Sequence, residues 1–542
     1  TGRLKIMATT VEVLVEAFQE SGTPFMVGHP GGESVEIMDA ARRADMRFIF
    51  IKQETAGAIL AATWGEITGS PGVALSTYGP GTANMANGVA HAWMDRAPLF
   101  AVNGQFSDHV YATGLRQRMN QAALYNPITK YHVSINAKTV RHQIRRAMRY
   151  ATSQPPGPVH IELPEDQSLQ EAGDMISDSP LRPNFVDVVP DKDSLKETLV
   201  MLKAAKKPII IAGLGIYWCK AASEFVDFAE KLGAPVITTT KCKGVIPEDH
   251  PLRAGCIIGG TLERELVNES DLIITVGLDA VELQPKPWPY TLPVLTLASA
   301  PNLDAVIPST QEVIGDLKPL LSSLTEYVGD GSNWGEKAAK DFQNKVTKAL
   351  DVPTKGMSPG AALITARSVM PRDTIATCDA GASRLLVVQK WESYGAQEFL
   401  TSNGLATMGA AIPCAMAARL AHPDRPVIAF TGDGGFFLTV AELQTAAVEN
   451  IPIIVLVFDD TEIGLIRVKQ EVKGVPPFGI GLGGVEWEKL AQGFGADGYV
   501  CDNEKALGDA LQAALKSERS SVVVAKIDSS CYVDQFNALR EV

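Results

Sequence analysis

The clearest chemical pattern in the sequence is a glycine-rich turn around an aspartate, Thr431-Gly-Asp-Gly-Gly435, which follows the apolar run Val427-Ile-Ala-Phe430. Its glycines let backbone N–H groups approach an anion closely at the start of a helix. The acidic pair Asp459-Asp460 follows the next apolar run, 26 and 27 residues after Asp433. Carboxylates at neighbouring strand ends would bind a Mg²⁺ ion that bridges a diphosphate. The alternative is an ordinary turn in which Asp433 caps a helix, and the acidic pair at this spacing favours the metal site.

Motifs for several other reaction classes are missing from the sequence. The seven cysteines form no C-x-x-C pair and the eight histidines form no i,i+4 pair, so we expect neither a zinc site nor a disulfide framework. Gly213-x-Gly215 lacks the third glycine of a dinucleotide fingerprint. A Walker A motif and a G-x-S-x-G elbow are also absent. We therefore do not expect an NAD site, nucleotide hydrolysis or Ser-His-Asp catalysis.

Strands that could position these groups are indicated by short apolar runs between glycine or proline residues. Such runs occupy residues 25–27, 48–50, 73–75, 99–102, 209–211, 236–237, 272–276, 294–295, 427–430 and 453–458. They alternate with helical stretches, which predicts α/β layers built on parallel sheets. Residues 166–193 and 329–358 have the composition of linkers. We therefore predict three doubly wound α/β domains, at 1–170, 190–328 and 355–542.

The first and third domains carry a similar local pattern. A strand leads into Gly79-Pro80-Gly81 in one and into Gly432-Asp433-Gly434 in the other, and a helix follows each turn. A proline then precedes the next strand, 19 residues after the first glycine in one case and 20 in the other. This repetition predicts two related domains whose ligands bind beyond the carboxyl ends of the strands.

Composition narrows the class of protein further. The 542 residues are 46% hydrophobic and 20% charged, which is typical of a globular enzyme and excludes a largely disordered or coiled-coil chain. A formal charge of -13 without a basic patch does not suit a nucleic-acid binder. The longest clean apolar run, 451–458, is too short to span a membrane. The N-terminal residues lack a signal-peptide core, and with the scattered cysteines this predicts a cytoplasmic protein.

Taken together, these motifs resemble the thiamin-diphosphate-dependent enzymes, and over nearly the whole chain the acetohydroxyacid synthase branch. The aspartate turn with acidic residues about 27 positions later matches the cofactor motif of that family. Segment 117–131 looks most like the catabolic acetolactate synthases. The other matching segments are Gly28-His-Pro-Gly-Gly32, Gln53-Glu54-Thr-Ala-Gly57, Ser76-Thr-Tyr-Gly79-Pro80-Gly81-Thr-Ala-Asn84, Gly104-Gln105 and Gly404-Leu-Ala-Thr-Met408-Gly409.

The resemblance implies roles for individual residues. Glu54 would hydrogen-bond N1′ of the aminopyrimidine ring and so start the proton relay. Gly32 would leave room for the substrate adduct, while Gln105 and Lys130 would contact a substrate carboxylate. Met408 would support the bent cofactor from below. The remaining cofactor-binding residues implied by the resemblance are Pro80, Asn84, Ser383, Gly432, Asp433, Gly434, Gly435 and Asp460. The implied metal ligands are Asp433, Asp460 and Glu462.

The resemblance also implies fold, partners and activity. The three domains would be pyrimidine-binding, central Rossmann-like and diphosphate-binding, and the active unit would be a homodimer that assembles into a homotetramer. The cofactors would be thiamin diphosphate and Mg²⁺, and FAD is not expected. The substrates would be small 2-oxo acids, without nucleic-acid or membrane partners.

The leading activity is the decarboxylating condensation of two pyruvates to 2-acetolactate. The alternatives are a 2-oxo acid decarboxylase or a carbon–carbon lyase on the same scaffold, and a non-catalytic cofactor-binding relative, against which Glu54 argues. Departures from the family concern mainly the substrate. Arg116 and Lys469 replace aromatic residues of the biosynthetic relatives, and the histidine pair of many pyruvate decarboxylases is missing near His109. At the second metal position, Asp460 stands where the family usually has Asn.

Overall fold

The computed structural model describes residues 8–173, 181, 188–329 and 331–539, which form two compact units. Its three six-stranded sheets are parallel throughout, so the predicted α/β class is confirmed. The first proposed linker, 166–193, lies partly outside the described residues, and so does residue 330 of the second. Among the described residues, no helix has both the length and the apolar character needed to cross a bilayer.

The N-terminal unit combines the described residues up to 181 with 412–423 and 439–451. Its sheet has the order β2-β1-β3-β4-β6-β5. The strands are β1 (Phe25–His29), β2 (Arg47–Phe50), β3 (Gly72–Ser76), β4 (Leu99–Gln105), β5 (Tyr131–Ser134) and β6 (Pro158–Pro164). The helices are α1 (Thr10–Glu20), η1 (Gly32–Ser34), α2 (Val35–Arg43), α3 (Glu54–Thr68), α4 (Pro80–Met94), α5 (Asp108–Thr113), α6 (Gln121–Tyr125), η2 (Asn126–Ile128), α7 (Val140–Thr152), α8 (Glu165–Ser168), most of α17 (Ala411–Ala421), and α19 (Glu442–Val448).

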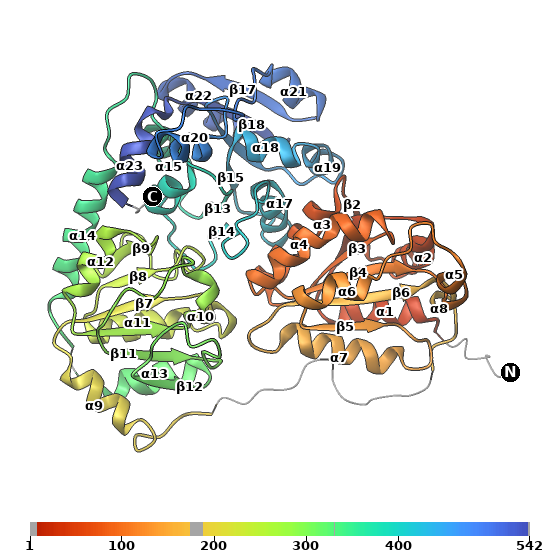
Figure 1. Cartoon of the computed structure of the whole chain (residues 1–542), viewed down its shortest axis with the longest axis horizontal. Coiled ribbons are helices and arrows are strands. Elements are labelled where there is room, and N and C mark those ends of the chain that lie inside the picture. Colours follow the sequence, from red (N-terminus) through yellow and green to blue (C-terminus); the bar gives the residue numbers. More distant parts are fainter. Residues whose placement is uncertain (1–7, 174–180, 182–187, 330, 540–542) are drawn as a thin grey trace. The chain divides into compact units, whose positions relative to one another are not determined.

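The two faces of this first sheet differ in chemistry. Leu75, Val102 and Ile161 lie in register on β3, β4 and β6 and enter an apolar core with α1, α2 and α7. Helices α3 and α4 pack together on the opposite side of the sheet (Figure 1). Because side chains alternate along a strand, the residues next to this apolar set face the other way, and Asn103 and Glu162 among them are polar. This polar face carries candidate residues of the N-terminal unit.

The C-terminal unit holds the two other sheets. The middle sheet has the order β12-β11-β10-β7-β8-β9. Read from β9 to β12 and numbered within the domain, this order is 3-2-1-4-5-6, which is the strand order of dinucleotide-binding folds. It agrees with the Rossmann-like central domain that the resemblance implied. Its strands are β7 (Pro208–Ala212), β8 (Val236–Thr238), β9 (Arg253–Cys256), β10 (Leu272–Val276), β11 (Val294–Ala298) and β12 (Gln311–Ile314). Its helices are α9 (Lys196–Ala204), α10 (Gly215–Trp218), α11 (Ala222–Leu232), α12 (Thr261–Asn268), η3 (Ala280–Glu282), α13 (Leu317–Tyr327) and α14 (Gly335–Leu350).

The third sheet has the order β14-β13-β15-β16-β18-β17, which repeats the strand order of the first sheet. Its strands are β13 (Ile375–Cys378), β14 (Phe399–Thr401), β15 (Val427–Gly432), β16 (Ile454–Asp459), β17 (Asp497–Cys501) and β18 (Ser521–Lys526). Its helices are α15 (Pro359–Val369), α16 (Arg384–Lys390), α18 (Asp433–Thr439), α20 (Gly464–Val472), α21 (Trp487–Gly493), α22 (Glu504–Ala514), η4 (Ser529–Cys531) and α23 (Tyr532–Leu539). One hydrophobic core joins this sheet to the middle one.

The shared strand order places comparable sites in the first and third sheets. The strand order reverses direction between β1 and β3 in the first sheet and between β13 and β15 in the third. Ligands of doubly wound folds bind beyond the carboxyl ends of the strands at such a point. In the first sheet this edge lies after β1 and β3, next to Gly32 and Gly79. In the third sheet it lies after β13 and β15, next to Asp379 and Asp433.

Candidate functional site

The aspartate turn lies where β15 passes directly into α18. A Cβ atom added to Gly435 would approach the Asp379 carboxylate to 2.2 Å, and one added to Gly434 would approach the Ile463 side chain to 2.6 Å. At Gly432 the same atom would meet nothing within 4 Å. The turn is therefore closely packed at Gly434 and Gly435 and open at Gly432, which leaves room for an anion next to its backbone N–H groups.

The Asp433 carboxylate has one oxygen without a protein partner. Its Oδ1 accepts a hydrogen bond from the backbone N–H of Gly434 at 2.7 Å, whereas its Oδ2 is buried and unpartnered among the described residues. Burial, followed by the negative charge of Asp460, raises the pKa of Asp433 to about 7. A buried, unpartnered carboxylate oxygen beside a second carboxylate is costly unless a cation compensates it, so these residues fit a bound Mg²⁺.

The two adjacent aspartates after β16 have different surroundings. Asp459 accepts a hydrogen bond from the indole N–H of Trp487 at 2.7 Å and forms an ion pair with Lys526. The charges of both aspartates raise the pKa of Asp433, and that of Asp460 has the larger effect. Burial, followed by the charge of Glu462, raises the pKa of Asp460 itself to about 6. Asp460 is therefore the better partner for Asp433 in holding a cation. Glu462 is already paired with Arg467.

A further carboxylate, Asp379, supports this site and was not found from the sequence. It follows β13, is buried, and accepts hydrogen bonds from the backbone N–H groups of Gly409 at 2.8 Å and Ala410 at 3.2 Å. The hydroxyl of Thr431 also donates to it, at 3.1 Å. Burial raises the pKa of Asp379 to about 6. Asp379 thus ties the segment after Met408 to the strand that carries the aspartate turn.

Met408 and Ser383 lie at the same edge of the third sheet. The Met408 side chain is 37% exposed, and its Cε lies 3.5 Å from the point where a Cβ of Gly434 would stand. Met408 is therefore not an ordinary core methionine, and its proposed role beneath the cofactor stays a prediction. Ser383 is buried directly before α16, and its hydroxyl role stays a prediction as well.

A separate group of candidate residues lies in the N-terminal unit around Glu54. This residue is the first of α3, only 8% exposed, and accepts a hydrogen bond from the side-chain amide of Asn84 at 3.1 Å. Helix α4, which carries Asn84, begins with Pro80 after a left-handed Gly79 at a φ of 71°. A Cβ on Gly81 would come within 3.1 Å of the Glu54 carboxylate. The segment predicted from Ser76 to Asn84 therefore holds and shields this acid.

The structure brings Gly32 and Gln105 to strand ends of the same sheet. Gly32 is the first residue of η1, and a Cβ there would meet nothing within 4 Å. Gln105 ends β4, and its side-chain amide donates to Glu162 at 3.3 Å. Both positions are compatible with a substrate role, which no contact in the structure tests.

Lys130 is already engaged in the structure. Its ammonium donates to the Ser153 carbonyl at 2.6 Å, the Ser153 hydroxyl at 2.8 Å and the Pro155 carbonyl at 2.6 Å. Burial lowers the pKa of Lys130 to about 8. An ammonium has three N–H donors, so a substrate contact would require at least one of these bonds to break. Its role in substrate binding stays a prediction, and these contacts favour a structural role.

Glu442 is another functional candidate, and no motif in the sequence pointed to it. It is fully buried and accepts hydrogen bonds from the backbone N–H of Lys52 at 3.2 Å and of Gln53 at 3.1 Å. Burial raises its pKa. These two N–H groups directly precede Glu54, so Glu442 fixes the start of α3. Glu442 and Lys52 are 390 residues apart, which is why no local pattern revealed the contact.

We expect Glu442→Ala to lower the free energy of unfolding of the N-terminal unit by about 1–3 kcal/mol, because backbone donors in a partly buried position lose their acceptor. Urea unfolding followed by circular dichroism measures this effect. Glu449→Ala is the control, since Glu449 pairs with Arg47, whose side chain is 42% exposed, and a surface pair contributes about 1 kcal/mol or less. Equal losses in the two variants would contradict the role given to Glu442.

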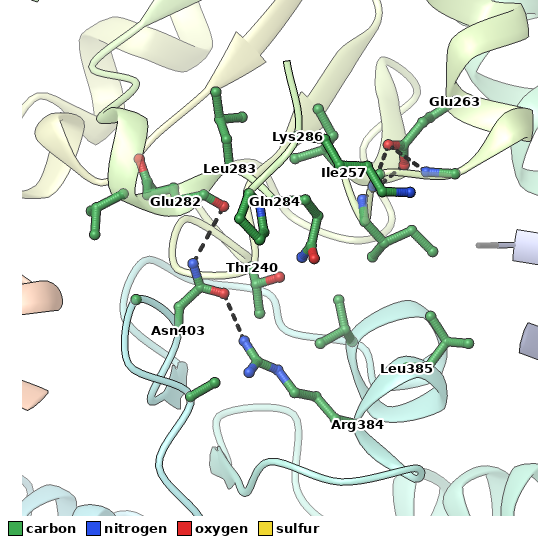
Figure 2. A pocket seen from close by; sticks show the side chains of 18 of the residues that line it. Thr240, Ile257, Glu263, Glu282, Leu283, Gln284, Lys286, Arg384, Leu385 and Asn403 are labelled. Carbon is green, nitrogen blue, oxygen red and sulfur yellow. Dashed lines mark hydrogen bonds between the residues drawn. The ribbon is translucent and has the colours of Figure 1, made fainter. Parts of the chain in front are cut away.

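A cavity of about 640 Å³ lies in the C-terminal unit (Figure 2). One wall comes from η3 and the loop before β11 and contains Glu282, Trp288 and Tyr290. The other wall contains Gly381 and Arg384 from the third domain. Arg384 donates to the Asn403 side chain at 2.7 Å, and Asn403 donates to the Glu282 carbonyl at 3.3 Å. The cavity thus reaches the loop that precedes Ser383. The expected absence of FAD stays a prediction.

Three models of known families match the chain in sequence. The "Thiamine pyrophosphate enzyme, N-terminal TPP binding domain" matches residues 8–124, the "central domain" of the same enzymes matches 195–324, and the "C-terminal TPP binding domain" matches 379–525. Each range overlaps one of the three sheets. The first includes Glu54, and the third includes Asp433.

Curated proteins also resemble the chain over most of its length. A "Probable acetolactate synthase large subunit" of Methanococcus aeolicus is 28% identical over 96% of this chain and 92% of its own. The "Acetolactate synthase large subunit" of Lactococcus lactis is 28% identical over 94% of this chain and 90% of its own. The "Acetolactate synthase, catabolic" of Raoultella terrigena is 26% identical over 95% and 94%. The likeness therefore extends over all three domains.

Proposed function

The chain belongs to the thiamin-diphosphate-dependent enzymes, and we propose that this acetolactate synthase-like member condenses two molecules of pyruvate to 2-acetolactate and CO₂ with the help of Mg²⁺. The observation that carries the metal-dependent part is the unpartnered, buried Oδ2 of Asp433 beside Asp460. Thiamin diphosphate, when bound, supplies the electron sink that allows a 2-oxo acid to lose CO₂.

The third domain would hold the diphosphate end of the cofactor. Asp433 and Asp460 would bind Mg²⁺, and the backbone N–H groups of the 432–435 turn would face the diphosphate. Ser383 would donate its hydroxyl and Met408 would contact the rings from below. Asp379 would act indirectly, because it holds Gly409 next to Met408 and Thr431 next to the 432–435 turn.

In the first domain, the Glu54 carboxyl would bind and release one proton. A carboxyl at N1′ of the aminopyrimidine can hold or release a proton in the positions that general acid–base catalysis requires. Asn84 orients this carboxyl through its side-chain amide. Glu442 holds the two backbone amides that precede it, so that the acid stays at the start of α3. The family resemblance implies that Glu54 of one chain meets the diphosphate-binding residues of another, so we propose a homodimer as the smallest active assembly.

Carboligation requires that a second 2-oxo acid, and not a proton, meets the bound donor. Gln105 is neutral at the end of β4 and can orient a carboxylate without delivering a proton. The missing histidine pair near His109 supports the same conclusion. A 2-oxo acid decarboxylase is the second candidate, and the engagement of Lys130 with Ser153 and Pro155 favours it, because it removes one proposed anchor for the acceptor.

A substrate panel tests the proposed donor. The purified chain, supplied with thiamin diphosphate and Mg²⁺, should release CO₂ from pyruvate faster than from 2-oxobutyrate, phenylpyruvate or benzoylformate. The release should disappear without thiamin diphosphate. A chain that leaves pyruvate untouched while it consumes another 2-oxo acid would contradict the proposed substrate and retain the cofactor assignment.

A further inference from the structure

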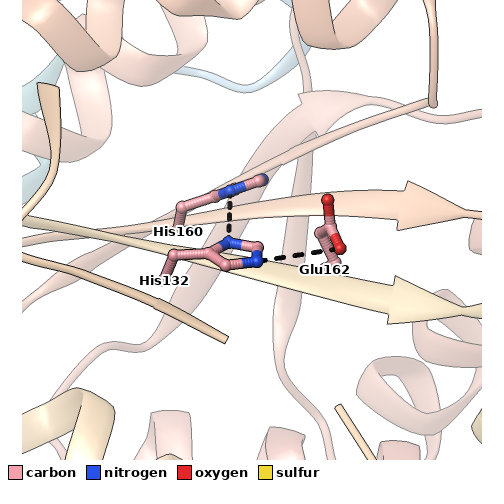
Figure 3. Close-up of side chains that lie close together, drawn as sticks. All are labelled: His132, His160 and Glu162. Carbon is pink, nitrogen blue, oxygen red and sulfur yellow. Dashed lines mark hydrogen bonds and ion pairs between the residues drawn. The ribbon is translucent and has the colours of Figure 1, made fainter. Parts of the chain in front are cut away.

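Two histidines and a glutamate lie together on the polar face of the first sheet. His132 on β5 is in register with His160 on β6, and Glu162 follows two positions later on the same face. One ligand atom from each of the three lies within 4.8 Å of the other two (Figure 3). The two histidines are 28 residues apart, so sequence spacing alone gave no sign of a metal site.

The imidazole rings face each other directly. Their Nδ1 atoms are 2.9 Å apart, so one of the two nitrogens carries a hydrogen and the other offers a lone pair. Burial lowers the pKa of both His132 and His160, which keeps the pair neutral. The Nε2 atom of His160 is buried and has no partner among the described residues. Neutral imidazoles are the form in which histidine binds metals.

The surrounding residues hold these side chains in position. The Tyr125 ring stacks on the His160 ring, with centroids 4.3 Å apart and planes at 17°. The Gln105 amide donates to Glu162 at 3.3 Å, and the Glu162 carboxylate lies 3.9 Å from Nε2 of His132. Supporting contacts of this kind orient the ligands of metal sites. The His132 side chain is 23% exposed, which gives an ion access from solvent.

From this cluster we infer that His132, His160 and Glu162 form a binding site for one divalent transition-metal ion. Two imidazoles and one carboxylate suit Zn²⁺ and its neighbours, whereas Mg²⁺ prefers oxygen ligands. Ligand atoms around a tetrahedral Zn²⁺ stand about 3.0–3.5 Å apart, so binding needs a side-chain shift of about 1 Å. The ion would bind Nε2 of His132 on the side that faces Glu162, while His132 keeps its hydrogen on Nδ1, and the His160 ring would turn toward the ion.

The proposed ion would connect elements that otherwise meet only through the sheet. β5 is the edge strand of the first sheet, and the site would fix it to β6. Through Glu162 it would also hold the Gln105 amide at the end of β4. The site is chemically distinct from the Asp433 pair, because it contains nitrogen ligands. It therefore goes beyond the proposed function and does not rest on it.

Metal titration of the whole enzyme tests the inference. The protein is first saturated with thiamin diphosphate and Mg²⁺, and Zn²⁺ binding is then measured by isothermal titration calorimetry. We expect one Zn²⁺ per chain that His132→Ala and Glu162→Gln each remove or weaken at least about 10-fold. His142→Ala is the matched control, because His142 is exposed on α7 in the same unit. Co²⁺ bound in place of Zn²⁺ should give a visible absorption band in the wild type and in His142→Ala only.

The His132 side chain is partly accessible and Glu162 is buried, and circular dichroism checks that each variant remains folded. Loss of one Zn²⁺ per chain in both variants, with the control unchanged, supports the site. Wild-type protein that binds no Zn²⁺ under these conditions would overturn it. Unchanged Zn²⁺ affinity in either variant would do so as well, whether or not the enzyme turns over pyruvate.

Discussion

The Glu54→Ala variant should lose at least about 100-fold in kcat while it keeps its fold and binds thiamin diphosphate, because a positioned proton relay contributes about 10²- to 10⁴-fold. Glu54 is 8% exposed, and among the residues that the structure describes its side chain accepts a hydrogen bond from Asn84. Removal of the Glu54 carboxyl should therefore leave the helix in place. Steady-state CO₂ release measures kcat, and circular dichroism monitors the fold.

A matched control for this prediction is Glu16→Ala, an exposed glutamate on α1, which should leave kcat unchanged. Asn84→Ala should give an intermediate loss, since the acid remains but loses its orienting amide. Turnover of Glu54→Ala within a few-fold of wild type would remove the proposed relay.

The second large effect concerns Asp433. The Asp433→Ala variant should bind thiamin diphosphate at least about 100-fold more weakly in the presence of Mg²⁺, because a metal ligand is lost and not only a supporting contact. Dialysis of the wild type against EDTA should likewise release metal and cofactor together. Isothermal titration calorimetry with Mg²⁺ in excess measures the Kd, and atomic absorption measures the metal content.

Asp497→Asn serves as the control for this experiment, because Asp497 on β17 of the same sheet pairs with Arg519 and accepts a hydrogen bond from the Ser517 hydroxyl. It should keep the Kd for thiamin diphosphate within a few-fold of wild type and lose stability instead. Tight Mg²⁺-dependent cofactor binding by Asp433→Ala would show that the metal lies elsewhere.

The parts of this fold that could be predicted from sequence are those with local signals. Apolar runs between glycine and proline residues correspond to strands in all three sheets. The repeated turn after β3 and β15 indicated two related domains, and the structure adds that their sheets have the same strand order. The Asp433 turn and the Asp460 position were also accessible, because the carboxyl ends of adjacent parallel strands meet at one edge. These signals are local, because a buried strand needs a run of apolar residues and a tight turn at a strand end needs glycine.

Other features depend on contacts between distant residues. No sequence motif distinguishes Asp379 from other residues that follow a strand. Its role becomes apparent only from the hydrogen bonds that the Gly409 N–H and the Thr431 hydroxyl donate to it. Glu442 acquires its role only when α19 packs on the start of α3. The His132–His160 pair arises from the β5–β6 register and escaped a search for local histidine spacing. The contacts of Lys130 with the Ser153 and Pro155 carbonyls were likewise not visible in the sequence, and its role toward substrate stays a prediction.

The most direct test of the proposed activity is the ratio of pyruvate consumed to CO₂ released, measured together with product identity. A synthase uses two pyruvates for each CO₂, and its acetolactate is detected as acetoin after acid treatment. We predict this ratio of two, with little acetaldehyde. A ratio of one with acetaldehyde as the product would contradict the synthase assignment and identify the enzyme as a 2-oxo acid decarboxylase.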